Sequence, residues 1–257
     1  MDHKKISFLI THYNRPKQLL NCINAIKLIN YPNFEIVVSD DSSKQEVIET
    51  IKTYNVNTLV IAETNKGLGA NINRGLRACK GEFIIYCQED FLLKASIKKV
   101  LPEVLNLIAN DKLDMVRFIS SYNFKKLKKI SINVSLIPKF SLKNFLFQSQ
   151  QYSDNPFITT IKFYDKNGYY LEGTSGDYGE TEYAIRIFKS KAKIGITNQS
   201  YVSYAANNNS VIDRKKNKER IQLRKKNKRL ARAIRLHLEA LLYRKSHRRL
   251  ITYKNLR

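Results

Sequence analysis

Residues 65–91 read NKGLGANINRGLRACKGEFIIYCQEDF, and this stretch decides the fold. A turn rich in glycine and asparagine leads into a helical pattern, and a short apolar strand follows at residues 82–87. The strand ends abruptly in Gln88, Glu89 and Asp90. In an open α/β sheet, ligands bind outside the carboxyl ends of the strands. We therefore expect Glu89 and Asp90 to face a substrate or a metal ion.

Strand-like and helix-like segments alternate through the first 120 residues. The strand candidates are short, apolar and rich in β-branched residues, as strands buried on both faces are. They cover residues 5–11, 34–39, 57–62, 82–87 and 114–119. The helical candidates between them cover residues 15–28, 46–54, 68–78 and 95–109. This alternation predicts an α/β fold with a mostly parallel sheet flanked by helices.

The pattern is weaker in the following part of the chain. Residues 121–172 show no sustained period, so we expect loops with a short helix near residues 142–148. This segment either shapes an acceptor pocket or forms an irregular surface excursion. A helix over residues 177–188, with Asp177 as its candidate N-cap, and a strand at residues 193–198 are expected next.

The end of the chain is strongly basic. The net charge of the protein is +24, and residues 214–257 hold 18 of its 46 lysines and arginines. We expect a long amphipathic helix here, so the chain divides into a main domain, residues 1–212, and a basic helical tail, residues 213–257. The apolar positions of the tail fall roughly on one side of this helix and are Leu223, Leu230, Ile234, Leu238, Leu241 and Leu242.

A tail of this charge density favours an anionic partner. The amphipathic pattern suits an anionic membrane surface, and the alternative is a helix packed on the core with a solvated cationic face. Nucleic acid is disfavoured as a partner because no recognised nucleic-acid module is present. The aromatic residues are also spread through the chain instead of interleaving with the basic tail.

The composition and the cysteine positions limit which classes of protein this chain can belong to. With 257 residues and 43% hydrophobic content, the chain can bury one sizeable core. Cys22, Cys79 and Cys87 form no C-x-x-C pair, which argues against a zinc site and a disulfide framework and favours a reducing compartment. No signal peptide is evident, and no apolar run approaches the ~18 residues that span a bilayer. We expect a cytoplasmic protein, either free or peripheral at the inner face of the plasma membrane.

Four polar motifs each follow a strand candidate, and a parallel sheet would bring them to one edge. They are Thr11–Pro16 (THYNRP), Ser39–Ser43 (SDDSS), residues 65–75 and Gln88–Asp90 (QED). In this order and spacing they resemble the inverting family 2 glycosyltransferases of the GT-A fold. In that family a T-x-Y-N-R, a V-V-D-D-S-S and an N-x-G-x-x-x-x-x-N-x-G motif precede an acidic metal motif. The resemblance covers residues 4–120.

The resemblance implies a binding site for a nucleotide-sugar donor. Asp41, with Asp40, would accept a hydrogen bond from the N–H of a uracil or thymine base, and Thr11 and Tyr13 would line the base pocket. The other donor-binding residues that the motifs imply are Asn14, Asn65, Gly67, Asn73, Arg74, Gln88 and Glu89. The alternative for residues 40–43 is a plain helix N-cap.

The resemblance also implies a divalent cation, Mn²⁺ or Mg²⁺, held by Asp90. Gln88 stands where the family has its first Asp, so Glu89 and Asp90 are the acids of this motif. A hard cation can take one or two protein carboxylates and complete its shell with phosphate oxygens and water. It would stabilise the charge on the departing nucleoside diphosphate. The alternative is that these residues only begin a helix after Phe91.

A second acidic segment supplies the candidate catalytic base. The family commonly has Glu-Asp followed by a further acid and an Arg. Alignment on Arg186 places Glu180 at the base position and Glu182 at the following acid, with Gly179 replacing the usual first Glu. A carboxylate here would deprotonate the acceptor hydroxyl. The alternative is a solvated acidic turn of a helix. Residues 197–210 contain no histidine that could complete a metal site.

Together these features predict an inverting glycosyltransferase. Its donor would be a UDP- or dTDP-sugar, and its acceptor would be a hydroxyl of a glycan, lipid-linked, in surface polysaccharide biosynthesis. Two alternatives come from other classes. One is a nucleic-acid-binding protein that uses the basic tail, and the other is a different nucleotide-binding transferase, which would need no acceptor base near Glu180.

Overall fold

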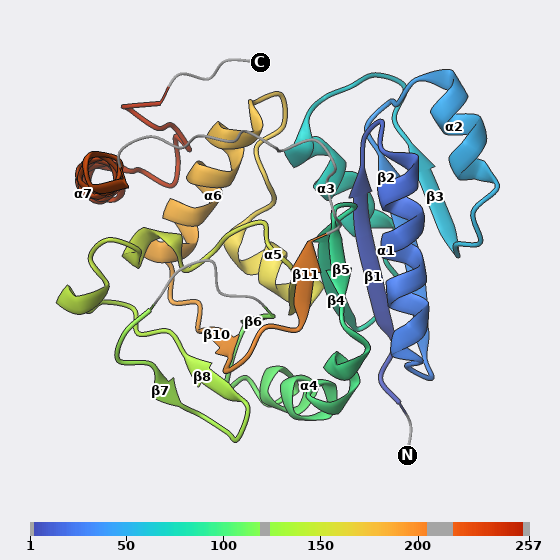
Figure 1. The fold of residues 1–257 in the computed structure, drawn as a ribbon, viewed down its shortest axis with the longest axis horizontal. Coiled ribbons are helices and arrows are strands. Elements are labelled where there is room, and N and C mark those ends of the chain that lie inside the picture. The colour runs from blue at the N-terminus through green and yellow to red at the C-terminus, as the bar shows by residue number, and fades with distance from the viewer. Residues whose placement is uncertain (1–2, 119–123, 205–217, 254–257) are drawn as a thin grey trace.

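The computed structural model describes residues 3–118, 124–204 and 218–253 of the protein, and for residues 218–226 it describes the backbone only. In this part of the chain a nine-stranded sheet forms the centre of the molecule, with helices on both faces (Figure 1). In sheet order its strands are β3 (Thr58–Ile61), β2 (Phe34–Asp40), β1 (Ile6–His12), β4 (Phe83–Gln88), β9 (Phe157–Thr159), β6 (Met115–Arg117), β10 (Ile194–Thr197), β8 (Val134–Leu136) and β7 (Lys128–Lys129). A second, two-stranded sheet pairs β11 (Val202–Tyr204) with β5 (Phe91–Leu93).

Strands β3, β2, β1 and β4 run parallel and form the predicted α/β part of the sheet. Each lies within one residue of its predicted bounds. The register places His12 beside Asp40 and Thr11 beside Gln88. These strands therefore end together, and the polar residues that follow them gather at one edge of the sheet.

The helices cover both faces of the sheet and are α1 (Pro16–Ile29), α2 (Gln45–Lys52), α3 (Leu68–Ala78), α4 (Leu101–Ala109), α5 (Ile161–Asn167), α6 (Gly176–Lys189) and α7 (Lys218–Leu242). Side chains alternate between the two faces along each strand. Phe8 and Ile10 of β1 therefore share a core with α1, α2 and α4, whereas Leu9 shares one with α3, α5 and α6. Three short 3₁₀ turns are η1 (Ala95–Lys99), η2 (Leu142–Asn144) and η3 (Gln148–Gln150).

α3 lies very close to the segment that precedes α6. A Cβ atom on Gly69 would lie 2.4 Å from the carbonyl oxygen of Leu171. We expect Gly69→Ala to lower the free energy of unfolding by about 1–3 kcal/mol, because the backbone of one segment must shift. Urea denaturation measures this loss. Gly176→Ala is the matched control, since nothing lies within 4 Å of a Cβ there. An equal loss in both variants would contradict the close approach.

The described part of residues 121–172 contains strands and a helix, so the expectation of loops is wrong there. β7, β8, β9 and α5 lie in this segment. β9 pairs antiparallel with both β4 and β6 inside the sheet. It is only three residues long, and its pairing depends on strands that are distant in sequence, so no local pattern reveals it. The short helix predicted near residues 142–148 is replaced by the turns η2 and η3.

Three local predictions also differ. The helix predicted over residues 95–109 consists of η1 followed by α4, which carries Pro102 in its first turn, where proline is tolerated. The N-cap of α6 is Ser175, whose hydroxyl accepts a hydrogen bond from the backbone N–H of Tyr178, and not Asp177. The chain continues after the acidic motif as β5, so the alternative of a helix there is wrong.

α7 lies at the edge of the molecule and packs against α6, which it crosses at a steep angle (Figure 1). The contact is apolar and involves Tyr178, Ile185, Leu236, Ala240, Tyr243 and Leu250. The tail helix therefore packs on the core through one of its faces. The boundary predicted at residues 212 and 213 lies outside the described residues, and the division into two domains stays a prediction. Among the described helices, none is both long enough and apolar enough to cross a membrane.

Candidate active site

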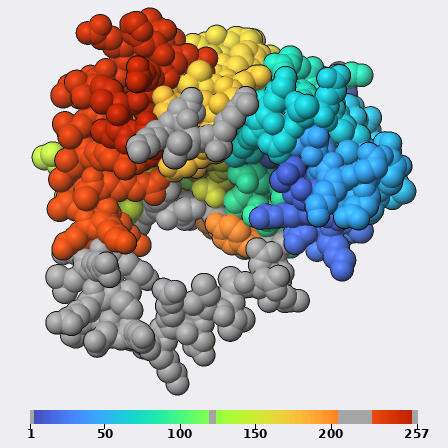
Figure 2. Space-filling model, turned by 90° about the horizontal axis from the view of Figure 1, so that it is seen from above, coloured from blue at the N-terminus to red at the C-terminus, as the bar shows by residue number. Residues whose placement is uncertain are grey.

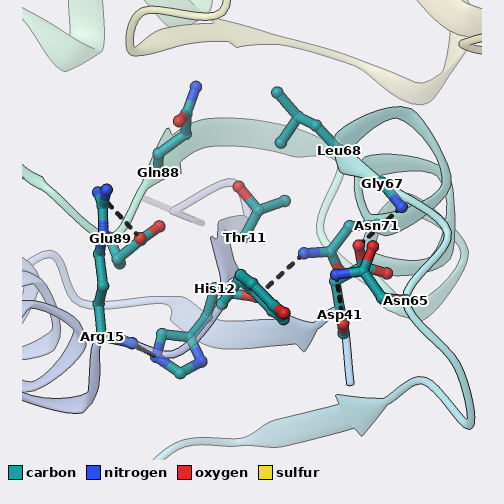
Figure 3. Close-up of a pocket in the computed structure, with 11 residues that line it drawn as sticks. Thr11, His12, Arg15, Asp41, Asn65, Gly67, Leu68, Asn71, Gln88 and Glu89 are labelled. Carbon is teal, nitrogen blue, oxygen red and sulfur yellow. Dashed lines mark hydrogen bonds and ion pairs between the residues drawn. The ribbon is translucent and has the colours of Figure 1, made fainter. Parts of the chain in front are cut away.

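A cavity of about 330 Å³ opens at the carboxyl ends of β1, β2 and β4. All four sequence motifs contribute to its wall, which is formed by Thr11, His12, Tyr13, Arg15, Asp41, Asn65, Gly67, Leu68, Asn71, Gln88 and Glu89. Figure 3 shows Arg15 and Glu89 on one side and Asp41, Asn65 and Gly67 on the other, with Thr11 between them. The sheet topology thus brings seven predicted donor-binding residues together: Thr11, Tyr13, Asp41, Asn65, Gly67, Gln88 and Glu89.

A buried histidine and aspartate shape the floor of this cavity. His12 Nδ1 lies 2.7 Å from Asp40 Oδ2, and both side chains are fully buried. The backbone N–H of Arg15 donates to His12 Nε2 at 3.1 Å, so we assign the proton of the neutral ring to Nδ1, which donates to Asp40. The two hydrogen bonds of the His12 ring fix the path of the chain after β1, and they therefore fix the position of the Arg15 backbone.

Asp40 lies behind the cavity wall. Burial by itself would raise the pKa of Asp40, but hydrogen bonds from His12 and from the hydroxyl and backbone N–H of Ser43 lower it below its usual value. Its carboxylate is thus committed to the β2 turn, so we reassign Asp40 from base binding to loop structure. The hydrogen bonds to Ser43 resemble those of the N-cap alternative, although the residue at the N-cap of α2 is Lys44.

Asp41 faces the cavity and holds the glycine-rich turn in place. Its Oδ2 accepts from the backbone N–H of Gly67 at 2.8 Å, and its Oδ1 accepts from that of Lys66 at 3.2 Å. Gly67 has a φ of 85°, which favours glycine, and a Cβ there would lie 3.2 Å from the carbonyl oxygen of Thr174. The turn before α3 therefore meets the segment before α6 at the cavity wall.

Three other predicted donor-binding residues hold loops together and do not line the cavity. The Nδ2 of Asn73 donates to the carbonyl oxygen of Tyr170, and its Oδ1 accepts from the N–H of Tyr170. Arg74 donates to the carbonyl oxygen of Asp40, and Asn14 Oδ1 accepts from the N–H of Lys44. These contacts position the motif segments, and direct donor contact by Asn14, Asn73 or Arg74 stays a prediction.

The acidic motif carries a carboxylate pair beside one guanidinium. Arg15 Nη1 lies 3.5 Å from Glu89 Oε1 and 3.7 Å from Asp90 Oδ2. Burial, followed by the charge of Asp90, raises the pKa of Glu89. Arg15 itself is half exposed, so its guanidinium can also meet a ligand in the cavity. Sequence analysis did not assign Arg15 a role, although the T-x-Y-N-R motif contains it.

The residues at this position fit a divalent cation that takes most of its ligands from a substrate. Asp90 Oδ1 is buried and has no hydrogen-bond partner among the described residues, and such an orphaned carboxylate oxygen suits a hard cation. The described part of the chain contains no cluster of three or more acidic, histidine or cysteine side chains that could hold a metal by itself. Phosphate oxygens and water would therefore have to complete the coordination shell.

Glu180 lies in the first half of α6, half-buried, next to a second carboxyl. The backbone N–H of Asp154 donates to Glu180 Oε1 at 3.3 Å. Asp154 is buried, and its Oδ1 accepts from the hydroxyls of Tyr152 and Tyr170 at 3.2 and 2.9 Å. Burial, followed by the charge of Glu180, raises the pKa of Asp154 well above its ordinary value. Asp154 thus keeps its proton more readily than an exposed aspartate does.

Contacts through the core connect this carboxyl pair to the cavity. The hydroxyl of Tyr86 lies 3.2 Å from Thr11 Oγ1 at the cavity wall. The ring of Tyr86 packs on Phe157, Phe157 packs on Tyr152, and the hydroxyl of Tyr152 donates to Asp154. Sequence analysis missed Asp154 because no pattern marks it. Only the fold brings residue 154 beside residue 180.

Glu182 is fully buried and links α6 to the end of the chain. Its carboxylate accepts hydrogen bonds from Arg186, at 3.0 Å for the Nε donor, and from the hydroxyl of Tyr243. Arg248 Nε lies 3.7 Å away. With its oxygens occupied and no surface exposed, Glu182 cannot reach a substrate. We therefore reassign Glu182 from catalysis to holding α7 and the following residues against α6.

Known proteins resemble this chain in sequence and in fold. Among curated proteins, the chain is similar to the putative glycosyltransferase EpsH of Bacillus subtilis, with 29% identity over 93 residues, and to the glycosyltransferase GlyG of Streptococcus pneumoniae, with 30% identity over 100 residues. These matches cover 35% and 37% of this chain and 27% and 33% of the two relatives. The chain therefore spans a third or less of the relatives' length.

Solved structures share the fold. The structure of S. aureus TarS 1–349 in complex with UDP-GlcNAc matches with a TM-score of 0.63 and 17% identity, over 95% of this chain and 69% of that chain. The mannosyltransferase PcManGT from Pyrobaculum calidifontis, in complex with GDP-Man and Mn²⁺, matches with a TM-score of 0.59 and 16% identity, over 93% and 70%. These likenesses confirm the GT-A fold. The family described as "Glycosyl transferase family 2" matches residues 7–167, which is more than half of the chain, so this protein belongs to glycosyl transferase family 2.

Proposed function

We propose that the protein is an inverting glycosyltransferase that moves a sugar from a UDP- or dTDP-linked donor to a hydroxyl of a glycan acceptor. The observation that carries this proposal is the cavity at the carboxyl ends of β1, β2 and β4, which combines Asp41 with Glu89. Family membership favours this function over a nucleic-acid-binding role for the basic tail.

The two sides of the cavity suit the two ends of a nucleotide diphosphate. On one side, Asp41 and Asn65 offer a carboxylate and an amide to a pyrimidine base and its ribose. On the other side, Arg15 places a positive charge next to the acidic motif, where the diphosphate would lie. The likeness to TarS, crystallised with UDP-GlcNAc, supports a uridine donor as the first candidate.

A divalent cation would bind at Asp90, with Glu89 beside it. When bound, Mn²⁺ or Mg²⁺ supplies a Lewis acid that stabilises negative charge on the leaving diphosphate. Arg15 would hold the same diphosphate through its guanidinium and keep it oriented for departure. The likeness to PcManGT, whose structure is in complex with GDP-Man and Mn²⁺, supports the cation.

Glu180 is the proposed general base. As the acceptor oxygen forms its bond to the anomeric carbon, the hydroxyl proton passes to Glu180, and the bond from that carbon to the phosphate oxygen breaks. The electron pair of the broken bond leaves with the nucleoside diphosphate. Attack from the face opposite the leaving group inverts the configuration. Asp154 positions Glu180 through the hydrogen bond from its backbone N–H, and it does not contact the substrate.

The acceptor is proposed to be a hydroxyl of a growing, lipid-linked glycan in surface polysaccharide biosynthesis. The names of similar proteins support this class, among them chondroitin synthase of Escherichia coli and the poly(ribitol-phosphate) β-N-acetylglucosaminyltransferase TarS. An acceptor of this kind is held at a membrane, which would place the protein at the inner face of the plasma membrane.

A thermal-shift screen of nucleotide sugars with Mn²⁺ tests the donor assignment. We expect a UDP- or dTDP-sugar to stabilise the protein, because a ligand at 100 times its Kd adds about 2.7 kcal/mol to the free energy of unfolding. GDP- and CMP-sugars serve as controls for the base. Stabilisation by a purine nucleotide sugar alone would overturn the pyrimidine assignment, and no stabilisation by any nucleotide sugar would overturn the function.

A further inference from the structure

The predicted apolar stripe of the tail is exposed on α7, apart from Leu223, whose side chain lies outside the described residues. The buried apolar residues of α7 and of the position after it are spaced three and four apart and are Ala233, Leu236, Ala240 and Tyr243, of which the last three share a cluster with Tyr178 and Ile185 of α6. The exposed apolar side chains Leu230, Ile234, Leu238 and Leu241, with the same kind of spacing, form the "outer stripe". Their exposed fractions are 45%, 47%, 49% and 76%. With 3.6 residues per turn, the centres of these two rows lie about 135° apart around the helix, so they form two different faces.

The outer stripe is not needed to hold α7 in place. The helix is already fixed by its inner face, by stacking of His237 on Phe145 at 4.3 Å, and by Glu239, which accepts from the backbone N–H groups of Ile251 and Thr252. A single exposed leucine on a protein surface is ordinary, but four on one face of one helix mark an interaction surface. Leu242, at 52% exposed, widens this surface at the C-terminal end of α7.

The charges around the outer stripe select an anionic partner. Exposed basic residues border the stripe at its two ends, where Lys228 and Arg229 precede Leu230 and where Arg244 and Lys245 follow Leu242. The acid among residues 227–245, Glu239, is fully buried, so no carboxylate of this part of α7 faces outward. Two copies of α7 meeting through this face would bring like charges together, which disfavours self-association. An apolar row bordered by arginine and lysine suits the boundary between lipid headgroups and acyl chains.

We propose that the outer face of α7 docks on an anionic lipid bilayer, with the outer stripe entering the acyl region and the basic residues meeting phosphate headgroups. Figure 2 shows the end of the molecule at which β1 and β2 finish, and α7 runs along one edge of this face. A bilayer held by α7 would thus lie beside the face on which the donor cavity opens. This docking does not rest on the proposed function, because none of the residues that carry it lines the donor cavity.

Vesicle sedimentation with the full-length protein tests the proposal. Leu238→Gln/Leu241→Gln is expected to lower the partition onto vesicles containing about one-third phosphatidylglycerol by about tenfold or more, because both side chains lose apolar contact with lipid. The matched control is Leu28→Gln/Ile132→Gln, two apolar side chains exposed at 73% and 79% on other surfaces, which should bind as the parent protein does. Glutamine keeps helix propensity, and circular dichroism checks the fold of each variant.

The charge component is tested separately. Lys228→Gln/Arg229→Gln should weaken binding to the same vesicles by about fivefold for each charge removed. A higher salt concentration should also weaken vesicle binding by the parent protein, because salt screens the attraction between the basic residues and the headgroups. Pure phosphatidylcholine vesicles should bind poorly. Unchanged vesicle binding by Leu238→Gln/Leu241→Gln would overturn the proposal, and so would equal binding of the parent protein to neutral vesicles. A parent protein that is dimeric in solution and becomes monomeric in that variant would assign the stripe to self-association.

The donor screen keeps this proposal distinct from the proposed function. Variants of the outer stripe should respond to nucleotide sugars with the same thermal shift as the parent protein, because α7 contributes no residue to the donor cavity. Loss of vesicle binding with unchanged donor binding is thus the expected result. Vesicle binding by a parent protein that binds no nucleotide sugar would support the docking surface while removing the transferase assignment.

Discussion

Replacing Glu180 with glutamine is expected to lower kcat for sugar transfer by about 100- to 10,000-fold, the range typical for loss of a general base. The amide has the same shape and can still accept the hydrogen bond that the backbone N–H of Asp154 donates to Oε1. It cannot take a proton from the acceptor hydroxyl. Binding of the nucleoside diphosphate should therefore stay nearly unchanged, as measured by calorimetry beside a transfer assay.

The control for this variant is Asp177→Asn, which removes an exposed carboxylate one turn earlier in the same helix. It should leave the rate within a few-fold of the parent protein, since a surface charge at a helix N-terminus contributes only about 0.3–1 kcal/mol. If Glu180→Gln lost donor binding and transfer to the same extent, Glu180 would belong to the donor site. Full activity of the variant would assign the base to another residue.

Asp90→Asn is expected to weaken donor binding in the presence of Mn²⁺ by about 10- to 100-fold, or 1.4–2.7 kcal/mol. The carboxylate loses its charge, and its buried Oδ1, which has no partner among the described residues, can no longer offer a full anionic ligand to the cation. The measurement is calorimetry with a UDP-sugar, with Mn²⁺ and again with a chelator. In the parent protein the chelator should reduce donor binding, and in the variant it should change little.

Glu46→Gln serves as the control for the metal experiment, because Glu46 is an exposed acid on α2, away from the cavity wall. It should keep the full response to Mn²⁺ and to the chelator. An Asp90→Asn protein with the same dependence on Mn²⁺ as the parent would remove Asp90 from the metal site. Donor binding that ignores the chelator in the parent protein would leave Arg15 as the cation that holds the diphosphate.

Local sequence patterns were sufficient for the parallel half of the molecule. α3 spans residues 68–78 as predicted, because a glycine at positive φ begins it and apolar residues recur on one face. β1, β2 and β4 follow from short apolar runs that end in polar motifs. Since the carboxyl ends of parallel strands share an edge, their order along the chain was enough to place Thr11, Asp41 and Glu89 in one cavity.

The same patterns could not tell neighbouring acids apart. Asp40 and Asp41 are adjacent, yet one is committed to His12 behind the wall and the other faces the cavity. Glu180 and Glu182 lie two residues apart on α6. A step of two residues turns a helix by about 200°, so Glu180 is half-buried beside Asp154 while Glu182 is sealed against Tyr243. A motif assigns residue types, and the packing around each side chain decides its role.

The sequence by itself determined the α/β architecture, the family resemblance and the edge of the sheet where the site lies, because periodicity and strand-end motifs are local properties of the chain. Only the tertiary structure inserted β9 between β4 and β6, brought Asp154 to Glu180, and buried Leu236 of α7 while leaving Leu238 and Leu241 exposed. Each of these depends on contacts between segments that are distant in sequence. Their free energy comes from burial and hydrogen bonding that form only when the whole chain has folded.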